Sequence, residues 1–464
     1  MTVIGVDDTD SREQGMCTTY LATRLAEAIA DAGGRVERTL LVRLNPAVEH
    51  KTRGNAALAI HTDLPTDDAL DLAVDHMERL AIDADSRTSP GIVVADGGPV
   101  AIPDAVADFA ADAIRERCDL ADAVDIADAA GYDHRGWAGD GCDVTGRGRI
   151  GALAAVGAWA AVDEWTYEQI AYREFDRCGT PREVDTDSLF AAAEQGYPTV
   201  WDTVDRAAGE AVCVPNAPGP ILYGIRGDDA DAVASVAGDI ESEPVDRSRC
   251  FWTNQGTDSH LQRGEMGGLR EGGAYRVNGV VSESPETEQG GHVFFTLTEI
   301  DDSDATVGSD AGVNSDATDG DVATSHSATA SRDASSEATV DCVAFEPTKR
   351  FRDRVRTLRT GDRLTVCGEY SDGTIKLEKF AVRELTRTEQ VTPTCPDCGC
   401  RMASAGKDQG YRCRDCGTSA AGLVSRSLDR DLEIGWYEVP PRARRHIARP
   451  LVRGGFDAPV HPER

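Results

Sequence analysis

The chain opens with Val3-Ile-Gly-Val-Asp-Asp-Thr-Asp10, and Gly15-Met-Cys-Thr-Thr-Tyr20 follows four residues later. The apolar run at the start is typical of a buried strand, and it ends directly in carboxylates. From Thr18 to Ala32 apolar residues recur at helical spacing, so a helix is predicted to begin inside the second stretch. The two stretches together place three aspartates at a strand end, opposite the first turn of a helix.

Carboxylates at a strand end suit Mg²⁺, which takes oxygen ligands and shares them with substrate phosphates. Free amides at a helix start favour an anion. Asp7, Asp8 and Asp10 therefore predict a metal-nucleotide site, and because the chain has no G-x-x-x-x-G-K-[ST] sequence, an ATP site here is not a P-loop. A plainer interpretation stays open, in which the aspartates end a strand and Thr18 only caps the helix.

The chain is strongly acidic, with 48 Lys and Arg against 81 Asp and Glu and a net charge of −33. Such a charge normally argues against a nucleic-acid partner, because phosphate binding needs local positive potential. Here the acidity is spread along the chain and lysine is scarce, which indicates halophilic adaptation to salt so high that the Debye length is about 3 Å. Local basic patches therefore say more about an RNA partner than the total charge does.

At 464 residues the chain is long enough for three or four domains. Residues 1–30 lack the uninterrupted apolar region of a secretory signal, and no run is long enough to span a bilayer. Thirteen cysteines then indicate thiols and metal ligands in place of disulfides. We expect a cytoplasmic protein without membrane contact.

The remainder of the first half alternates predicted strands (39–44, 55–60, 92–94) with a predicted helix (67–81), which indicates an α/β layer. Ligands of open α/β sheets bind beyond the carboxyl ends of strands. Asp7 and Asp8 lie at such an end, and we expect the Pro90-Gly91 turn nearby.

Lys51 and Arg53 are two of the few cations in this half, and they precede Asn55. Their functional interpretation is a phosphate clamp, with arginine binding as a fork and lysine as a point charge. The alternative is a pair of solvated loop charges.

A predicted helical region at 102–130 leads into a glycine-rich passage at 131–149, which is either a phosphate-binding loop or a hinge. A second unit follows. Its predicted elements are a helix at 166–175, a strand at 221–225, a helix at 229–240 and a strand near 250–252, and they indicate a small α+β sandwich.

From Gly273 the pattern changes to five short strands, predicted at 275–281, 292–297, 339–345, 363–370 and 375–383. This pattern suits an OB-type β-barrel, a fold often used on single-stranded nucleic acid, although a barrel without that role has the same pattern. Residues 301–339 are rich in Asp, Ser, Ala and Thr and have no Phe, Trp or Tyr. Such a composition buries too little surface to fold, so we expect a disordered acidic insert.

Two C-x-x-C knuckles, Cys395/Cys398 and Cys413/Cys416, are separated by 14 residues. This spacing places four thiolates around one tetrahedral Zn²⁺, and a closed set of four ligands indicates a structural site. Cys400 is a further thiol, so a ligand set that uses it stays open.

The C-terminal stretch Tyr437-Glu-Val-Pro-Pro-Arg-Ala-Arg-Arg-His446 is the most conspicuous basic patch. In an acidic chain it predicts contact with a phosphate backbone through Arg442, Arg444 and Arg445; a solvated basic tail is the alternative.

Several motifs occur here in one order along the chain. They are Gly5-Val-Asp-Asp-Thr-Asp10, Gly15-Met-Cys-Thr-Thr19, Arg43-Leu-Asn-Pro46, Lys51-Thr-Arg-Gly-Asn55, Leu222-Tyr-Gly-Ile-Arg-Gly227, Thr253-Asn-Gln-Gly-Thr-Asp258, Ala344-Phe-Glu-Pro-Thr-Lys349, the zinc knuckles and the C-terminal arginines. In this order the chain resembles, from end to end, the archaeal tRNA(Ile) 2-agmatinylcytidine synthetase family, TiaS.

The resemblance implies an ATP-dependent ligase that conjugates agmatine to position 2 of the wobble cytidine of the isoleucine tRNA with a CAU anticodon. The product, agmatidine, pairs with A, so the tRNA decodes AUA. ATP, Mg²⁺ and Zn²⁺ are the expected cofactors, the tRNA and agmatine are the expected partners, and no DNA is expected. The acidic insert departs from the family pattern.

The resemblance also implies a multidomain α+β fold. We expect a kinase-like α/β domain at 1–145, a ferredoxin-like domain at 146–262, an OB-fold at 273–386, a zinc ribbon at 387–420 and a basic tail at 421–464.

By the same resemblance, Thr18 matches a threonine that is autophosphorylated, and Asp7, Asp8 and Asp10 match the catalytic acids. Mg²⁺ is expected on Asp7 and Asp8. The residues expected to bind ATP are Thr19, Lys51, Arg53, Asn55, Pro90 and Gly91, and those expected to bind tRNA are Lys349, Arg442, Arg444 and Arg445. An ATP-regulated RNA-binding protein without catalytic activity and an RNA kinase that ignores agmatine are the competing functions.

Overall fold

The computed structural model describes residues 1–464 except 12, 14, 50, 52–53, 83 and 301–337. Arg53 and nearly all of the expected acidic insert therefore lie outside the described residues. The expected end of that insert at residue 339 is wrong, because strand β15 begins at Thr339 and pairs there with β14.

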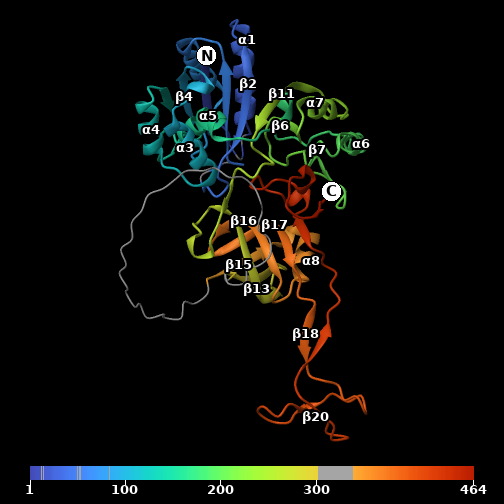
Figure 1. Ribbon diagram of the computed structural model, residues 1–464. Helices are drawn as coiled ribbons and strands as arrows, with labels where there is room; N and C mark the ends of the chain where they lie inside the picture. The colour runs from blue at the N-terminus through green and yellow to red at the C-terminus, as the bar shows by residue number, and fades with distance from the viewer. Residues whose placement is uncertain (12, 14, 50, 52–53, 83, 301–337) are drawn as a thin grey trace, which may run out of the picture.

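A nine-stranded sheet runs through the upper body in the order β5-β4-β1-β3-β2-β11-β6-β10-β7 (Figure 1). Its first unit contains β1 (Thr2–Asp7), β2 (Val36–Arg43), β3 (Ala56–Thr62), β4 (Gly91–Asp96) and β5 (Asp133–Gly136). Helices α1 (Thr18–Asp31) and α2 (Thr66–Leu80) share a core with one face. Helices α3 (Asp104–Arg115), α4 (Leu120–Ala129) and α5 (Arg149–Ala161) share a core with the other.

The expectation of parallel strands, as in open α/β sheets, is wrong for this unit. Strand β1 is antiparallel to both β3 and β4, and among the described strands of this sheet only β2 and β11 pair in parallel. An antiparallel neighbour starts where β1 ends, so Gly91 pairs with Asp7. The end of β1 therefore meets the starts of β3 and β4.

Helix α5 packs within the first unit, although a boundary at 145–146 assigns it to the second. It is alanine-rich and buried along most of its length between the sheet and α3. A Cβ on Gly5 would lie 2.1 Å from the Ala152 carbonyl oxygen, so the helix touches β1 directly.

The second unit adds β6 (Thr166–Arg173), β7 (Val200–Trp201), β10 (Ile221–Gly227) and β11 (Val245–Thr253), with helices α6 (Thr186–Gly196) and α7 (Ala230–Gly238). The helix expected at 166–175 is wrong, since β6 lies between β10 and β11 as an antiparallel strand. Buried Thr166, Glu168 and Ile170 alternate with less buried neighbours, which is the two-residue period of a strand.

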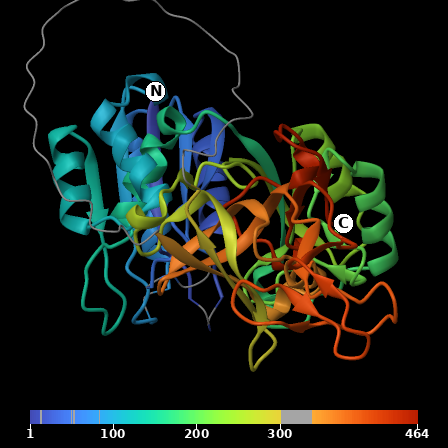
Figure 2. The same ribbon diagram turned by 60° about the horizontal axis from the view of Figure 1, so that its bottom comes forward.

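Below the body, the five expected barrel strands are confirmed. They are β13 (Ala274–Thr287), β14 (Val293–Thr298), β15 (Thr339–Ala344), β16 (Arg363–Ser371) and β17 (Thr374–Glu384). They close in the order β13-β14-β15-β17-β16-β13 around an apolar core, with helix α8 (Arg350–Arg356) packed against it. Seen from the barrel side, the barrel lies across the middle of the body (Figure 2).

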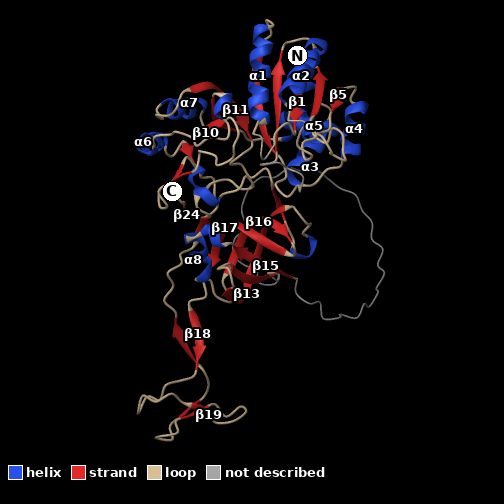
Figure 3. Cartoon of the chain, turned by 180° about the vertical axis from the view of Figure 1, so that it is seen from behind, coloured by secondary structure: helices blue, strands red, loops and turns tan. Residues whose placement is uncertain are grey.

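Beyond the barrel, β18 (Thr388–Val391) and β22 (Val424–Ser427) form a hairpin that carries the cysteine knuckles away from the body (Figure 3). The expected tail at 421–464 is wrong, because the chain then returns to the barrel. Strand β23 (Gly435–Glu438) pairs with β17, and β24 (Val460–His461) pairs with β23. Within the described part of the chain, no helix is both long and apolar enough to cross a membrane.

Candidate active site

A cavity of about 500 Å³ opens where β1 ends, between the first and second units of the body. Seven of the residues expected in the catalytic and ATP sites line it. They are Asp7, Asp8, Asp10, Thr18, Thr19, Lys51 and Asn55. Pro90 and Gly91 are not among the lining residues, although Gly91 pairs with Asp7 at the cavity edge.

Two glycines at the start of α5 allow the helix to approach Asp7. A Cβ on Gly148 would lie 2.7 Å from the Asp7 carbonyl oxygen, and one on Gly151 would lie 2.0 Å from Asp7 Oδ2. The carboxylate thus lies at the amino end of α5 as well as at the end of β1. The glycine-rich passage left open as a loop or a hinge therefore serves close packing against the acidic stretch.

The aspartates lie in an environment that disfavours negative charge. Burial, followed by the charge of Asp8, raises the pKa of Asp7 well above its usual value. Burial raises the pKa of Asp8 to about 6, although Arg147 Nη2 lies 2.7 Å from Asp8 Oδ2 and acts in the opposite direction.

This donor set fits a divalent cation that completes its shell elsewhere. Within the described residues, the three aspartates do not form a cluster with all ligand atoms within 4.8 Å. Mg²⁺ commonly uses one or two protein carboxylates together with waters and substrate phosphates, and a bound cation would relieve the repulsion at Asp7.

Thr18 and Thr19 are the first two residues of α1, and Cys17 is the N-cap residue. Thr18 Oγ1 accepts a hydrogen bond from Thr9 Oγ1 at 3.2 Å, so its hydroxyl faces the acidic loop. Thr19 Oγ1 instead lies 3.1 Å from Cys17 Sγ. Since Thr18 makes no capping hydrogen bond through its side chain, the interpretation of Thr18 as a simple cap is wrong.

The opposite wall of the cavity contains a charged group that sequence reasoning missed. Glu168 is buried between Arg43 and Arg226, with N–O distances of 3.2 Å to each. Burial alone would raise the pKa of Glu168, but the charges of Arg226 and Arg43 outweigh it and leave that pKa below its usual value. The group joins β2 of the first unit to β6 and β10 of the second.

On the near wall, Lys51 Nζ donates to the Pro46 carbonyl, and Asn55 Nδ2 donates to the Asn45 carbonyl at 2.9 Å. Both side chains thus brace the loop after β2 while they line the cavity.

At the far end of the hairpin, Cys395, Cys398, Cys413 and Cys416 have all their sulfur atoms within 4.8 Å of one another. Four thiols so arranged fit one tetrahedral Zn²⁺. Cys398, Cys400 and Asp415 form a second group that meets the same distance limit.

We expect Cys395→Ser to abolish zinc binding and to expose residues 392–432 to proteolysis, because a small ribbon depends on its metal to fold. The body should melt at the wild-type temperature. Metal analysis and limited proteolysis measure this, with Cys400→Ser as the control that keeps its zinc. Loss of zinc from Cys400→Ser alone would assign the ion to the second group.

The arginines expected to bind RNA are held by carboxylates of other segments. Arg444 is almost fully buried, so the expected exposed basic patch is wrong there. The pairs are Arg442–Glu210, Arg444–Asp202, Arg444–Glu438, Arg445–Glu369 and Arg445–Glu378. Lys349 is exposed beside Glu346.

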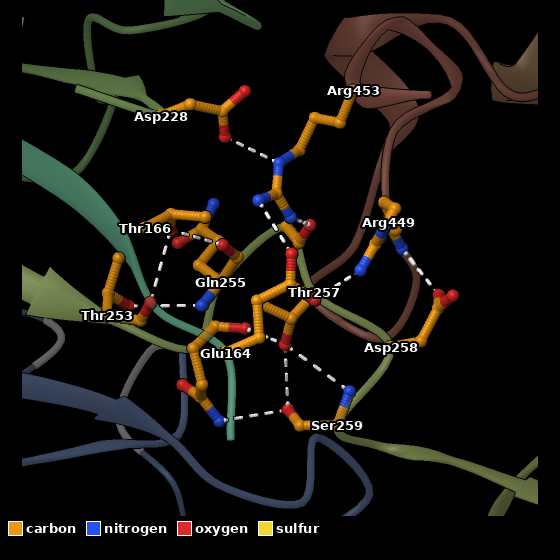
Figure 4. A network of polar contacts seen from close by, with 12 residues as sticks. Glu164, Thr166, Asp228, Thr253, Gln255, Thr257, Asp258, Ser259, Arg449 and Arg453 are labelled. Carbon is orange, nitrogen blue, oxygen red and sulfur yellow. Dashed lines mark hydrogen bonds and ion pairs between the residues drawn. The ribbon is translucent and has the colours of Figure 1, made fainter. Parts of the chain in front are cut away.

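The same C-terminal segment continues this role further along (Figure 4). Arg449 and Arg453 both pair with Glu164, which precedes β6, and Arg453 also pairs with Asp228. Asp258 accepts from the Arg449 backbone amide at 2.8 Å. These arginines join the barrel end of the chain to the second unit.

We expect Arg444→Met to lower the free energy of unfolding by about 3–5 kcal/mol, because Asp202 and Glu438 would stay buried without their partner. Arg442→Met, at an exposed pair, should cost about 1 kcal/mol or less. Urea denaturation followed by tryptophan fluorescence compares the two. Equal costs would show that burial does not distinguish these pairs.

Models of three protein domains match this chain: the TiaS TCKD domain at residues 3–138, the TiaS FLD domain at 146–260 and the TiaS C-terminal zinc ribbon domain at 392–432. TiaS of Haloquadratum walsbyi, a 2-agmatinylcytidine synthetase for isoleucine tRNA, is 60% identical over 100% of both chains. That of Methanosarcina mazei is 40% identical over 97% of both. A crystal structure of TiaS in complex with isoleucine tRNA and ATP, 36% identical, superposes with a TM-score of 0.82 over 100% of this chain and 99% of that one. A complex of TiaS with the tRNA, AMPCPP and agmatine, 34% identical, gives 0.79 with the same coverage.

Proposed function

The chain belongs to the TiaS family of 2-agmatinylcytidine synthetases for isoleucine tRNA, and from this premise we propose that it uses ATP to conjugate agmatine to that tRNA. The modified base is the wobble cytidine of the CAU anticodon, and the product is agmatidine at its position 2. The reaction makes the enzyme an ATP-dependent ligase.

The cavity at the end of β1 is the observation that carries this assignment to particular residues. Its floor presents Asp7, Asp8 and the Thr18 hydroxyl, and its far wall presents Arg43 and Arg226. Acids that can share a cation with phosphates, beside cations that can receive transferred charge, suit phosphoryl transfer.

The chemistry explains why a ligation needs phosphoryl transfer. The carbonyl oxygen at position 2 of cytosine cannot leave, so an amine cannot displace it directly. Phosphorylation of that oxygen makes it a leaving group, after which the amine attacks the ring carbon and phosphate departs. We assign Thr18 as a phosphate acceptor of the protein itself, with Asp7, Asp8 and Asp10 as the catalytic acids.

The nucleotide is assigned to the near side of the cavity. Thr19, Lys51 and Asn55 would contact ATP there, and the Pro90-Gly91 turn would support the edge beside Asp7. Mg²⁺ bound at Asp7 and Asp8 would neutralise triphosphate charge. Arg53 stays a prediction, since it lies outside the described residues.

Agmatine carries two positive charges on a short alkyl chain, so its site needs carboxylates beside an apolar wall. The cavity offers both at its first-unit rim, where Glu49, Glu116 and Asp119 lie near Leu44 and Val48. We propose this rim as the place where the amine waits.

The architecture supports a division into a kinase-like unit, a ferredoxin-like unit, an OB-fold and a zinc ribbon. The mixed α/β body, the closed five-stranded barrel and the cysteine cluster agree with it. In this division α5 belongs with the kinase-like unit, since it packs on β1.

One incubation tests the function: the protein with ATP, labelled agmatine and a transcript of the isoleucine tRNA with a CAU anticodon. We expect the label to enter the tRNA only when all three are present. Phosphorylated tRNA formed without agmatine dependence would instead identify an RNA kinase. Binding of tRNA without turnover of ATP would identify an RNA-binding protein.

A further inference from the structure

The most basic exposed segment of the described chain follows β15. Residues 345–359 carry six cationic side chains against Glu346 and Asp353, a net charge of +4 in a chain of −33. We define the basic ridge as Lys349, Arg352, Arg354, Arg356 and Arg359. These residues lie on helix α8 and its two ends.

The ridge differs from the C-terminal arginines in how its charge is compensated. Each C-terminal arginine described above has a carboxylate of another segment at its guanidinium. On the ridge, Arg354 and Arg359 are exposed, and within the described chain neither has a carboxylate within 4.0 Å. Lys349 is 53% exposed and meets only a local partner, Glu346.

The ridge also has a continuous course. Lys349, Arg352 and Arg356 recur at spacings of three and four residues, so they share one side of the helix. Phe345, 36% exposed, lies beside them with its ring 5.2 Å from that of His292. Cations next to an exposed aromatic ring form the combination that binds a nucleic-acid backbone and its bases.

The two ends of α8 connect the body to the zinc hairpin. At the first end, Arg350 Nη2 lies 3.1 Å from Asp205 Oδ1 of the second unit. At the other, the Thr357 carbonyl accepts from Arg430 Nη2 at 3.2 Å, at the root of the β18–β22 hairpin. Helix α8 accordingly lies beside the barrel between the body and the hairpin (Figure 1).

We propose that the basic ridge is a docking surface for the phosphate backbone of the tRNA, which it holds along the barrel while the target base is in the cavity. This inference rests on the proposed function. It moves the RNA contact from the C-terminal arginines, whose charge is compensated inside the protein, to a surface whose charge is available.

Arg354→Glu and Arg359→Glu, alone and together, test the ridge by tRNA binding over a range of KCl in which circular dichroism shows folded protein. We expect each single variant to weaken binding about fivefold or more, and the pair to reduce the slope of log K against log[KCl] by about 1.4–1.8. Arg35→Glu is the matched control, because it makes the same charge change at a side chain that is 71% exposed, beside the end of β2 that is remote from the cavity. It should bind like wild type.

Two further measurements separate the ridge from the active site. ATP binding without RNA should be unchanged in the ridge variants, and agmatidine formation should recover at saturating tRNA. Unchanged tRNA affinity and slope in the double variant would overturn the proposal, and so would an equal loss in Arg35→Glu. If wild-type protein bound tRNA but formed no agmatidine, the proposed function would fail while the binding series still decided on the ridge.

Discussion

Thr18→Ala abolishes agmatidine formation, with a loss of about a thousandfold or more, while the protein stays folded. The expected loss is large because a phosphate acceptor has no substitute once its hydroxyl is removed. The expected cost to folding is about 1 kcal/mol, since the change removes one buried hydrogen bond, the one from Thr9. Nucleoside mass spectrometry of the tRNA measures the product, and thermal unfolding measures the fold.

Thr19→Ala is the decisive comparison, because the two threonines are adjacent, buried and both line the cavity. The Thr18 hydroxyl faces the acidic loop, whereas that of Thr19 contacts Cys17. We therefore expect Thr19→Ala to keep activity within about tenfold of wild type, and Thr18→Ser to keep part of it. Near-normal product from Thr18→Ala, with loss in Thr19→Ala, would transfer the acceptor role to Thr19.

The parts of the molecule that sequence reasoning predicted correctly are those whose signal is local. The zinc ligands are two short motifs, and the five barrel strands are short alternating runs bounded by turns. The acidic stretch and Thr18 were placed together because a strand end and a helix start are close in the chain.

The errors have one physical cause, namely pairing between distant residues. Residues 166–173 form a strand because β10 and β11 flank them, and their length alone suggested a helix. Glu168 was missed with them, since its partners Arg43 and Arg226 come from strands far away in sequence. Arg444 looked available for RNA for the same reason: nothing near it in the chain announces Asp202.

Asp7→Asn is expected to stabilise the ligand-free protein and to remove its activity. Asp7 binds a proton more tightly in the folded protein than in the unfolded chain, because burial and Asp8 raise its pKa. Its ionisation at neutral pH therefore lowers the free energy of unfolding, and a neutral amide of the same shape should restore about 1–3 kcal/mol. The same substitution removes a charge that the nucleotide's cation requires, so ATP-dependent product should fall about a thousandfold.

Asp8→Asn supplies the matched contrast, since it makes the same change one residue further on. Asp8 is paired with Arg147, whose guanidinium would lose its carboxylate, so no gain in stability is expected. Thermal unfolding without nucleotide compares the two variants, and product formation completes the test. A lower melting temperature for Asp7→Asn would show that the ionised Asp7 carboxylate stabilises the fold, and its assignment as a strained cation ligand would then be wrong. The expected pattern, more stable and inactive for Asp7→Asn but inactive without the gain for Asp8→Asn, would show that the strand-end acid is kept for catalysis at a cost to the fold.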